Sequence, residues 1–308
     1  MKLASLLLLL AGAAGPAAAS HSHSSISRLS HRHGHVSRAT RRELTLSKRC
    51  KTKDNRKSKS NSDNDSGNDY SGTGGGYNGG STTGQSSGVI NVPSSCGPIG
   101  ATVEVTPTTG PNGAIDWLNC GVNDSGWRPP FVRVSDIIAK NLTEAIQEDG
   151  SPFRACDAYI DTFEQYAAQY GVPAILVAAI AMQESSCDAG TVGGGGEQGL
   201  MQLTQDKCGG APGGDCKDPD FNIRAGVEYF SEMLRSNGES LLLTMGNYNG
   251  WPLGMTYDDA TAAGDTSCCT CQNNLDYLQQ TFNGWVLNVD PYSSTPPIGK
   301  YFNLNKCH

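Results

Sequence analysis

An unbroken apolar run from Val172 to Met182, followed by Gln183-Glu184-Ser185, places the tightest constraint on the fold of this chain. A helix that is apolar all round has no side to present to water, so the other elements must surround it. Pro173 is favourable at the start of a helix. We therefore predict a buried helix that ends near Glu184 and places a carboxyl group beside the most hydrophobic segment of the folded part.

The charge of the chain divides near residue 95. Residues 1–95 hold 13 Lys and Arg against 5 Asp and Glu, whereas the remainder holds 10 against 25. The two balances, +8 and −15, account for the net charge of −7. An acidic folded part argues against nucleic acid as the partner. It also offers no electrostatic attraction to an anionic cell wall.

Residues 1–19 have the pattern of a secretory signal peptide, with Lys2, a short apolar core and small residues up to the cut. The core is too short to span a bilayer, and we expect a secreted, extracellular protein with no membrane partner.

Residues 20–49 are interpreted as a propeptide ending at the dibasic pair Lys48-Arg49, with an uncut linker as the alternative. Residues 50–95, basic and then rich in Gly and Ser, are expected to be disordered. The catalytic domain is expected at residues 96–308.

Ten of the eleven cysteines lie beyond residue 95, which in a secreted chain indicates up to five disulfides. The closely spaced cysteines of Cys268-Cys269-Thr270-Cys271 could indicate a metal-binding motif. However, the only His after His35 is the terminal His308, so disulfides are the better interpretation. The His-rich segment 21–35 is interpreted as a solvated leader, with metal binding as the less favoured alternative. We expect no metal and no other cofactor. Glycosylation sequons begin at Asn64, Asn123 and Asn141.

Apolar residues recur at helical spacing in several segments, which predicts a mainly α fold. The expected helices are residues 134–147, 152–170, 173–184, 218–236, 239–245 and 272–284. Ahead of them, residues 97–133 form a Gly-, Pro- and Thr-rich lead-in tied by disulfides, in which a short hairpin is expected around 101–105. Glycine-rich loops at 193–196 and 209–214 join the helices.

Cleavage of a glycosidic bond needs an acid that is still protonated near working pH, and apolar surroundings raise the pKa of a carboxyl group. Glu184 suits that role, although a helix-end Glu facing water is the plain alternative. Gly199-Leu-Met-Gln202 predicts a tight turn whose amide can donate to and accept from an acetamido group or a sugar hydroxyl. Tyr248 and Asn249 add a phenol and an amide, and Trp251 adds a ring that could stack on a sugar face.

Other catalytic classes are excluded by composition. The folded part has no His before its terminus, so Ser-His-Asp and Cys-His schemes do not apply. No phosphate-cradling glycine motif occurs.

Together, Glu184-Ser185, Gly199-Leu-Met-Gln202 and Tyr248-Asn249 resemble the soluble lytic transglycosylases and, more loosely, the goose-type lysozymes. The resemblance covers about residues 155–285, and the lead-in looks like that of secreted fungal members. It implies a lysozyme-like helical domain in which Glu184 is the catalytic acid/base and Gln202, Tyr248 and Asn249 line the sugar site. Two positions depart from the family pattern, Gly193 in place of a hydroxyl residue and Asn247 in place of Ala.

The resemblance implies lytic transglycosylation of peptidoglycan by a single Glu, which leaves 1,6-anhydro ends. Hydrolysis of the lysozyme or chitinase type is the alternative, since Glu197 and Asp206 flank the Gln202 motif and could hold a water; ordinary surface charge is the plainer interpretation of both. Chitin remains the alternative substrate. A secreted lectin-like glycan binder is the non-enzyme alternative, but it would not need Glu184. A monomer is expected.

Overall fold

A computed structural model of the chain describes residues 88–307. This part contains eight α-helices joined by short 3-10 turns, and its only β pairs are isolated bridges from Val192 and Leu203 to Gln198. The helices are α1 Ile115–Leu118, α2 Leu142–Ala145, α3 Ile160–Tyr170, α4 Ala174–Ser185, α5 Pro219–Ser236, α6 Leu241–Tyr248, α7 Tyr257–Thr261 and α8 Tyr277–Asn283. The predicted mainly α fold class is confirmed. The predicted signal peptide and propeptide, most of the linker, Cys50 and Asn64 lie outside the described residues.

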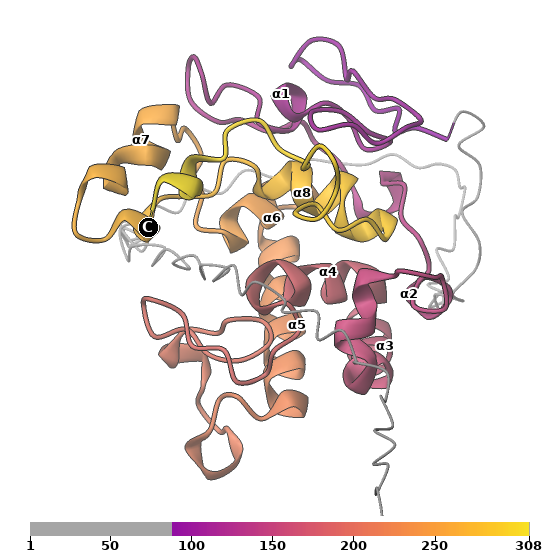
Figure 1. Cartoon of the computed structure of the whole chain (residues 1–308), viewed down its shortest axis with the longest axis vertical. Helices are drawn as coiled ribbons and strands as arrows, with labels where there is room; N and C mark the ends of the chain where they lie inside the picture. Colours follow the sequence, from indigo (N-terminus) through magenta and orange to yellow (C-terminus); the bar gives the residue numbers. More distant parts are fainter. Residues whose placement is uncertain (1–87, 308) are drawn as a thin grey trace, which may run out of the picture.

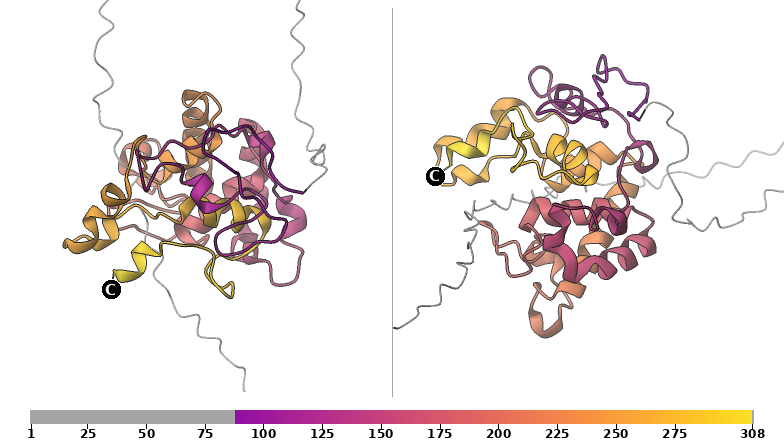
Figure 2. Two further views of the ribbon diagram at one scale, coloured as in Figure 1. Left: turned by 90° about the horizontal axis from the view of Figure 1, so that it is seen from above. Right: turned by 45° about the vertical axis from the view of Figure 1, so that its right-hand side comes forward.

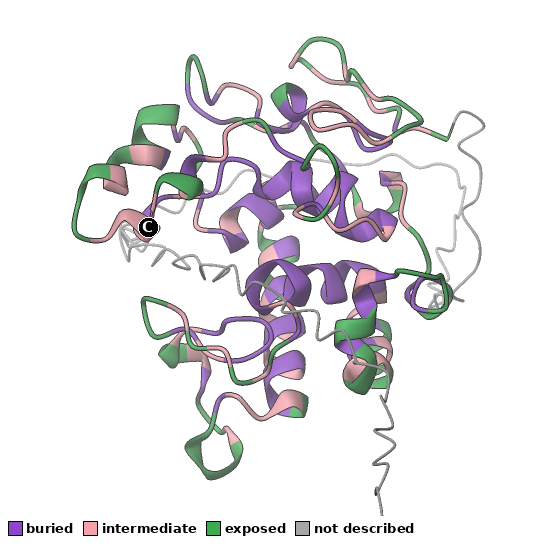
Figure 3. Ribbon diagram, viewed as in Figure 1, coloured by how far each residue is buried: buried purple, intermediate pink, exposed green. Residues whose placement is uncertain are grey.

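Helix α4 occupies the centre of the molecule, as its all-apolar sequence predicts. Every residue from Ile175 to Ser185 is buried. Helix α3 packs against α4 and α5, while α8 and the turn after it cover α4 from the opposite side (Figure 1). Colouring by burial shows α4 as an almost continuous buried ribbon, with α8 also buried and α3 and α5 partly exposed (Figure 3).

Residues 134–147, predicted as one helix, form two short pieces instead. A 3-10 turn at Val134–Asp136 ends in extended backbone, and α2 begins only after Asn141. Between them, the backbone N–H of Ile138 donates to Asn112 Oδ1 at 2.7 Å and that of Lys140 donates to the Val286 carbonyl at 2.9 Å. Hydrogen bonds to distant segments therefore replace the intrahelical ones, and tertiary contacts override the apolar periodicity.

The other helix boundaries differ in smaller ways. The predicted 152–170 helix is a 3-10 segment up to Tyr159 followed by α3. The predicted 272–284 helix shortens to α8, and the predicted 239–245 helix extends so that Tyr248 becomes the last residue of α6. Helix α7 was not predicted. Ile90 is 3 % exposed, so packed structure begins before the predicted boundary at residue 96.

The lead-in lies over α8, on the side away from α3 and α5 (Figure 1, Figure 2). Trp117 and Trp127 fill its interior, and the Trp127 indole N–H donates to the Leu118 carbonyl at 3.3 Å. The hairpin predicted around 101–105 does not form. Instead, Thr102 and Thr106 each donate a backbone hydrogen bond to the tight loop at Thr109–Gly110, which closes an irregular turn.

All ten cysteines of the described part form disulfides, as predicted. The pairs are Cys96–Cys120, Cys156–Cys187, Cys208–Cys216, Cys268–Cys271 and Cys269–Cys307. Cys269–Cys307 joins the C-terminal segment to the loop before α8. Among residues 88–307, no helix is both long enough and apolar enough to cross a bilayer.

Candidate active site

Glu184 lies one residue before the end of α4, and its side chain is 1 % exposed. Its Oε1 accepts a hydrogen bond from the Tyr277 hydroxyl of α8 at 2.8 Å. Its Oε2 is buried and has no hydrogen-bond partner. The carboxyl group is thus held on one oxygen and free on the other, as an acid that must give its proton to a substrate atom should be.

Burial raises the pKa of Glu184 from its usual 4.5 to about 8. The hydrogen bond from Tyr277 acts in the opposite direction and lowers the pKa, while the nearby carboxylate of Glu197 raises it further. The neutral form therefore predominates at pH 7, which is the form that a general acid needs. Desolvation beside an apolar helix is the main cause, as expected from the sequence around Glu184.

Three helices hold the turn that contains Gly-Leu-Met-Gln. From α4, the Ser185 hydroxyl donates to the Leu200 carbonyl at 2.8 Å. From α5, Asn222 Oδ1 accepts from the Met201 N–H at 2.8 Å, and from α6, the Tyr248 hydroxyl donates to the Met201 carbonyl at 2.9 Å. The three motifs that are far apart in the sequence are therefore joined through this backbone.

Glycine is required at the first position of the turn. Gly199 has φ 78°, and a Cβ there would overlap the side-chain amide of Asn222. That amide donates to the carbonyls of Gln198 and Cys216, at 2.9 Å and 2.7 Å, so it has no room to move away. Because Gly199 has no Cβ, α5 can lie close to the turn.

Gln202 completes the turn in a strained conformation, with φ 48° and no exposed surface. Its Nε2 donates to the carbonyls of Gly199 and Thr191, at 2.8 Å and 3.2 Å, whereas its Oε1 is buried without a partner. A left-handed residue other than Gly costs free energy and is typical of functional positions. The unpartnered oxygen is available as an acceptor.

Tyr248 and Asn249 end α6 beside this turn. Tyr248 is fully buried, and its pKa is raised well above 10 by burial and by the nearby charge of Glu184. Asn249 Oδ1 accepts from the Trp251 indole N–H at 3.0 Å, which leaves Asn249 Nδ2 buried and unpartnered. Only six buried side-chain polar atoms of residues 88–307 lack a partner, and Glu184, Gln202 and Asn249 supply three of them.

Trp251 does not fit its predicted role as a stacking platform. It is 1 % exposed and packs edge-on against Trp127, with ring centroids 5.0 Å apart. Its contact with Asn249 makes it a residue that orients the amide. Tryptophan has a large apolar body and one N–H donor, and the structure buries the body and uses the donor.

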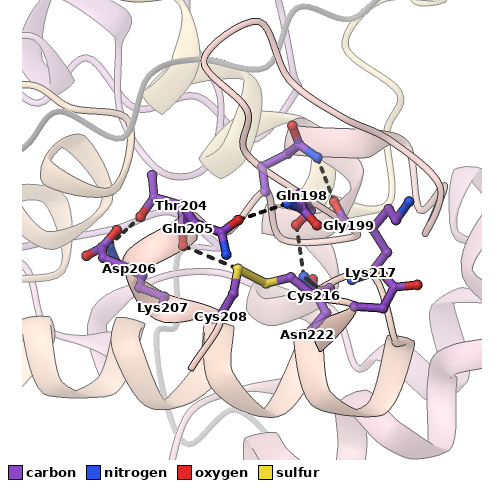
Figure 4. The surroundings of a disulfide bond; sticks show 12 residues. Gln198, Gly199, Thr204, Gln205, Asp206, Lys207, Cys208, Cys216, Lys217 and Asn222 are labelled. Carbon is purple, nitrogen blue, oxygen red and sulfur yellow. Dashed lines mark hydrogen bonds and ion pairs between the residues drawn. A yellow bond between two sulfur atoms is a disulfide. The ribbon is translucent and has the colours of Figure 1, made fainter. Parts of the chain in front are cut away.

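The two acidic residues considered for positioning a water are separated by the fold. Glu197 is 3 % exposed, accepts from the Gly195 N–H at 3.0 Å and acts electrostatically on Glu184. Asp206 is 64 % exposed, and Lys207 lies 3.3 Å from it (Figure 4). A hydrogen bond from Thr204 lowers the pKa of Asp206, with Lys207 also contributing. Asp206 is thus surface charge, and Glu197 alone remains close to the acid.

Two residues of the site were not predicted from the sequence. Tyr277 lies 93 positions after its partner Glu184, and Asn222 lies 21 positions after Met201. Both stand in helices, where Tyr is a common core residue and Asn a common surface one. No local pattern signals their roles. In the residues that the structure describes, no group of three or more His, Cys, Asp or Glu is placed to hold a metal.

Residues 161–256 match the family model described as "Transglycosylase SLT domain". The matched segment makes up about a third of the 308-residue chain. It runs from α3 to the residue before α7 and contains Glu184, the Gln202 turn and Tyr248-Asn249. The matched segment ends before Tyr277, so the group that holds the acid comes from outside it.

One curated relative is the membrane-bound lytic murein transglycosylase F 1 of Alkalilimnicola ehrlichii, 37 % identical over 83 residues. The match covers 27 % of this chain and 17 % of the relative, so the chain spans about a sixth of that protein's length. An inactive mutant of the lytic transglycosylase Slt from Pseudomonas aeruginosa has 22 % identity and a TM-score of 0.31, over 48 % of this chain and 25 % of that one. The 70 kDa soluble lytic transglycosylase of Escherichia coli has 24 % identity and a TM-score of 0.30, over 42 % and 22 %.

Replacing Tyr277 with Phe should shift the alkaline limb of the pH profile of kcat/KM to higher pH. The Tyr277 hydrogen bond lowers the pKa of Glu184, so its loss raises that pKa and keeps the acid protonated to higher pH. A hydrogen bond to a charged group is worth about 1.5–3 kcal/mol, which corresponds to a shift of about one pH unit or more. The pH profile of kcat/KM checks this shift. Tyr166→Phe, which removes a phenol bonded to Asp220, is the matched control; equal profiles for Tyr277→Phe and the wild type would contradict the role.

The raised pKa of Glu184 should also appear in stability. Because the folded pKa of about 8 exceeds the usual 4.5, the stabilisation is complete below pH 4.5 and is lost as the pH rises toward 8. Relative to Glu184→Gln, which cannot ionise, the wild type should lose about 1.4 kcal/mol of unfolding free energy per pH unit across this interval. Denaturant unfolding of both proteins at pH 5, 6, 7 and 8 measures the difference. A constant difference would show that Glu184 titrates normally.

Proposed function

We propose that this chain is a secreted enzyme that cleaves the β-1,4-linked glycan of peptidoglycan by lytic transglycosylation. The single observation that carries the proposal is Glu184, a buried carboxyl group whose pKa is raised to about 8 and whose Oε2 is free. A lectin has no use for such a group, because burying an unpaired carboxyl costs stability. The match to the SLT family supports the reaction class.

In this mechanism Glu184 acts twice. It first donates its proton to the oxygen of the glycosidic bond as that bond breaks. The resulting carboxylate then removes a proton from the 6-hydroxyl of the same sugar, and that oxygen attacks C1 to close a 1,6-anhydro ring. The second step needs a base with a high pKa, and desolvation supplies it. Tyr277 keeps the carboxyl group oriented through both steps.

The buried polar atoms near Glu184 fit the recognition of an amino sugar. Gln202 Oε1 is an acceptor and Asn249 Nδ2 is a donor, and neither has a partner within the protein. An acetamido group carries one N–H and one carbonyl, so it complements this pair. A sugar lacking that group would leave both atoms unsatisfied, at a cost of about 1–3 kcal/mol each.

Hydrolysis is the second candidate, because Glu197 lies close enough to raise the pKa of Glu184. A second carboxylate near the acid can activate a water in place of the substrate hydroxyl. Chitin, which shares the acetamido group, is the alternative polymer. Secretion rests on the predicted signal peptide at residues 1–19 and on the compartment in which disulfides persist.

The proposal is tested by incubating the purified protein with purified peptidoglycan and, separately, with chitin. Release of soluble fragments from peptidoglycan, with chitin little affected, is the expected result. If the protein binds either polymer but releases no fragments, it is a glycan-binding protein and not an enzyme. Release of fragments from chitin but not from peptidoglycan would identify chitin as the substrate.

A further inference from the structure

The sequon Asn123-Asp124-Ser125 lies on an exposed turn of the lead-in. The backbone N–H groups of Asp124 and Gly126 both donate to the Gly121 carbonyl, at 3.0 Å and 2.8 Å, so the turn is well defined. The Ser125 side chain makes no hydrogen bond with the described residues. This sequon plays no part in the proposed catalysis.

Two tyrosines from distant segments stand next to Asn123. Its Nδ2 donates to the hydroxyl of Tyr301 at 3.0 Å. The ring of Tyr301 lies 6.0 Å from that of Tyr257, which begins α7 and is 42 % exposed. The Tyr257 N–H donates to the Val122 carbonyl at 2.8 Å, which fixes α7 against the turn. An exposed amide and a partly exposed aromatic pair thus form one continuous surface.

We propose that Asn123 carries an N-linked glycan whose first N-acetylglucosamine lies against Tyr257 and Tyr301. An unmodified side-chain amide has two N–H bonds, and Tyr301 takes only one of them. Glycosylation replaces one hydrogen and leaves the other, so the contact with Tyr301 survives. The apolar faces of a sugar and of a tyrosine ring can then cover each other, with the tyrosine hydroxyl at the polar edge.

The modification is a transfer from a lipid-linked oligosaccharide diphosphate. The bond between C1 of the first sugar and the diphosphate oxygen breaks, and a bond from C1 to Asn123 Nδ2 forms. The amide loses one proton, and the lipid diphosphate leaves. This inference rests on the proposed secretion, because a chain meets this donor during its export.

The glycan would join three segments that contact one another only in the folded protein. These are the turn at Asn123, the start of α7 and the C-terminal segment that bears Tyr301. The C-terminal segment is held nearby by Asp276, whose Oδ2 accepts from the Phe302 N–H at 2.6 Å. We therefore expect the glycan to raise Tm by about 2–4 °C, the shift that about 1 kcal/mol produces in a domain of this size.

The test uses the full chain, produced in a secreting eukaryotic host both with its own residues 1–19 and with the host's leader in their place. Intact mass is measured for the wild type, Ser125→Ala and Ser125→Thr. Ser125→Ala removes the sequon without touching the Asn123–Tyr301 contact, and Ser125→Thr restores it. The wild type and Ser125→Thr should each be heavier than Ser125→Ala by one glycan, and peptide N-glycosidase should remove that difference.

The two leaders separate the two proposals. Equal masses for the wild type and Ser125→Ala behind the host's leader overturn the glycan at Asn123. Secretion with the host's leader but not with residues 1–19 overturns the proposed secretion and leaves the sequon result standing.

Docking of the first sugar is tested by thermal unfolding. After an endoglycosidase has trimmed the glycan to one N-acetylglucosamine, the wild type should still melt about 2–4 °C above Ser125→Ala. In the Tyr257→Ala background this gap should close. If the difference in Tm caused by the trimmed glycan is the same in the wild-type and Tyr257→Ala backgrounds, the contact with the tyrosines is overturned.

Discussion

Glu184→Gln is expected to lower the rate of peptidoglycan cleavage by about 10²–10⁴-fold, the usual contribution of general acid/base catalysis. The substitution keeps the shape of the side chain and the contact with Tyr277 but removes the proton that the glycosidic oxygen needs. Initial rates of soluble fragment release, at matched protein concentration, measure the effect. Circular dichroism and Tm should show an intact fold, since an amide is easier to bury than a carboxylate.

The control is Glu232→Gln, an isosteric change at an exposed position of α5. It should leave the rate unchanged. If Glu184→Gln kept more than about a tenth of wild-type activity, the acid would be another residue. Glu197, buried and close to Glu184, would then be the first candidate.

The products are expected to end in 1,6-anhydro-N-acetylmuramic acid. Such products weigh about 18 mass units less than hydrolysed ones, because no water is added across the bond. Mass spectrometry of the soluble fragments distinguishes the two outcomes directly. The expectation follows from Glu184 as sole acid and base, since Asp206 is exposed and paired with Lys207.

Glu197→Gln decides the role of the second buried carboxyl group. If Glu197 only modulates Glu184, the variant should keep anhydro products and lower the pKa of Glu184, because a neighbouring negative charge is lost. Wild-type products with reducing ends only, lost together with activity in Glu197→Gln, would assign lysozyme-type hydrolysis. Asp206→Asn should change neither the products nor the rate.

Much of the fold follows from local patterns in the chain. The run around α4 is apolar at nearly every position, and α5 has a clear helical stripe, so both were predicted within one or two residues. Residues 134–147 have similar spacing, yet they do not form one helix. Asn112 and Val286 supply hydrogen bonds to that backbone, and neither is visible from the segment itself. Periodicity reports which residues avoid water, and not which partners the backbone finds.

The sequence by itself determined that a carboxyl group would end a buried helix and that a glutamine turn and a Tyr-Asn pair would follow. It also determined that the part of the chain beyond residue 95 is acidic and rich in cysteine, because composition and spacing carry those properties. Only the tertiary structure decided that Tyr277 holds Glu184 and that Trp251 is buried against Trp127. It also separated Glu197 from Asp206, two acidic residues that look alike in the sequence. The physical reason is that burial and hydrogen bonding depend on neighbours from α5, α6 and α8, which chain position does not reveal.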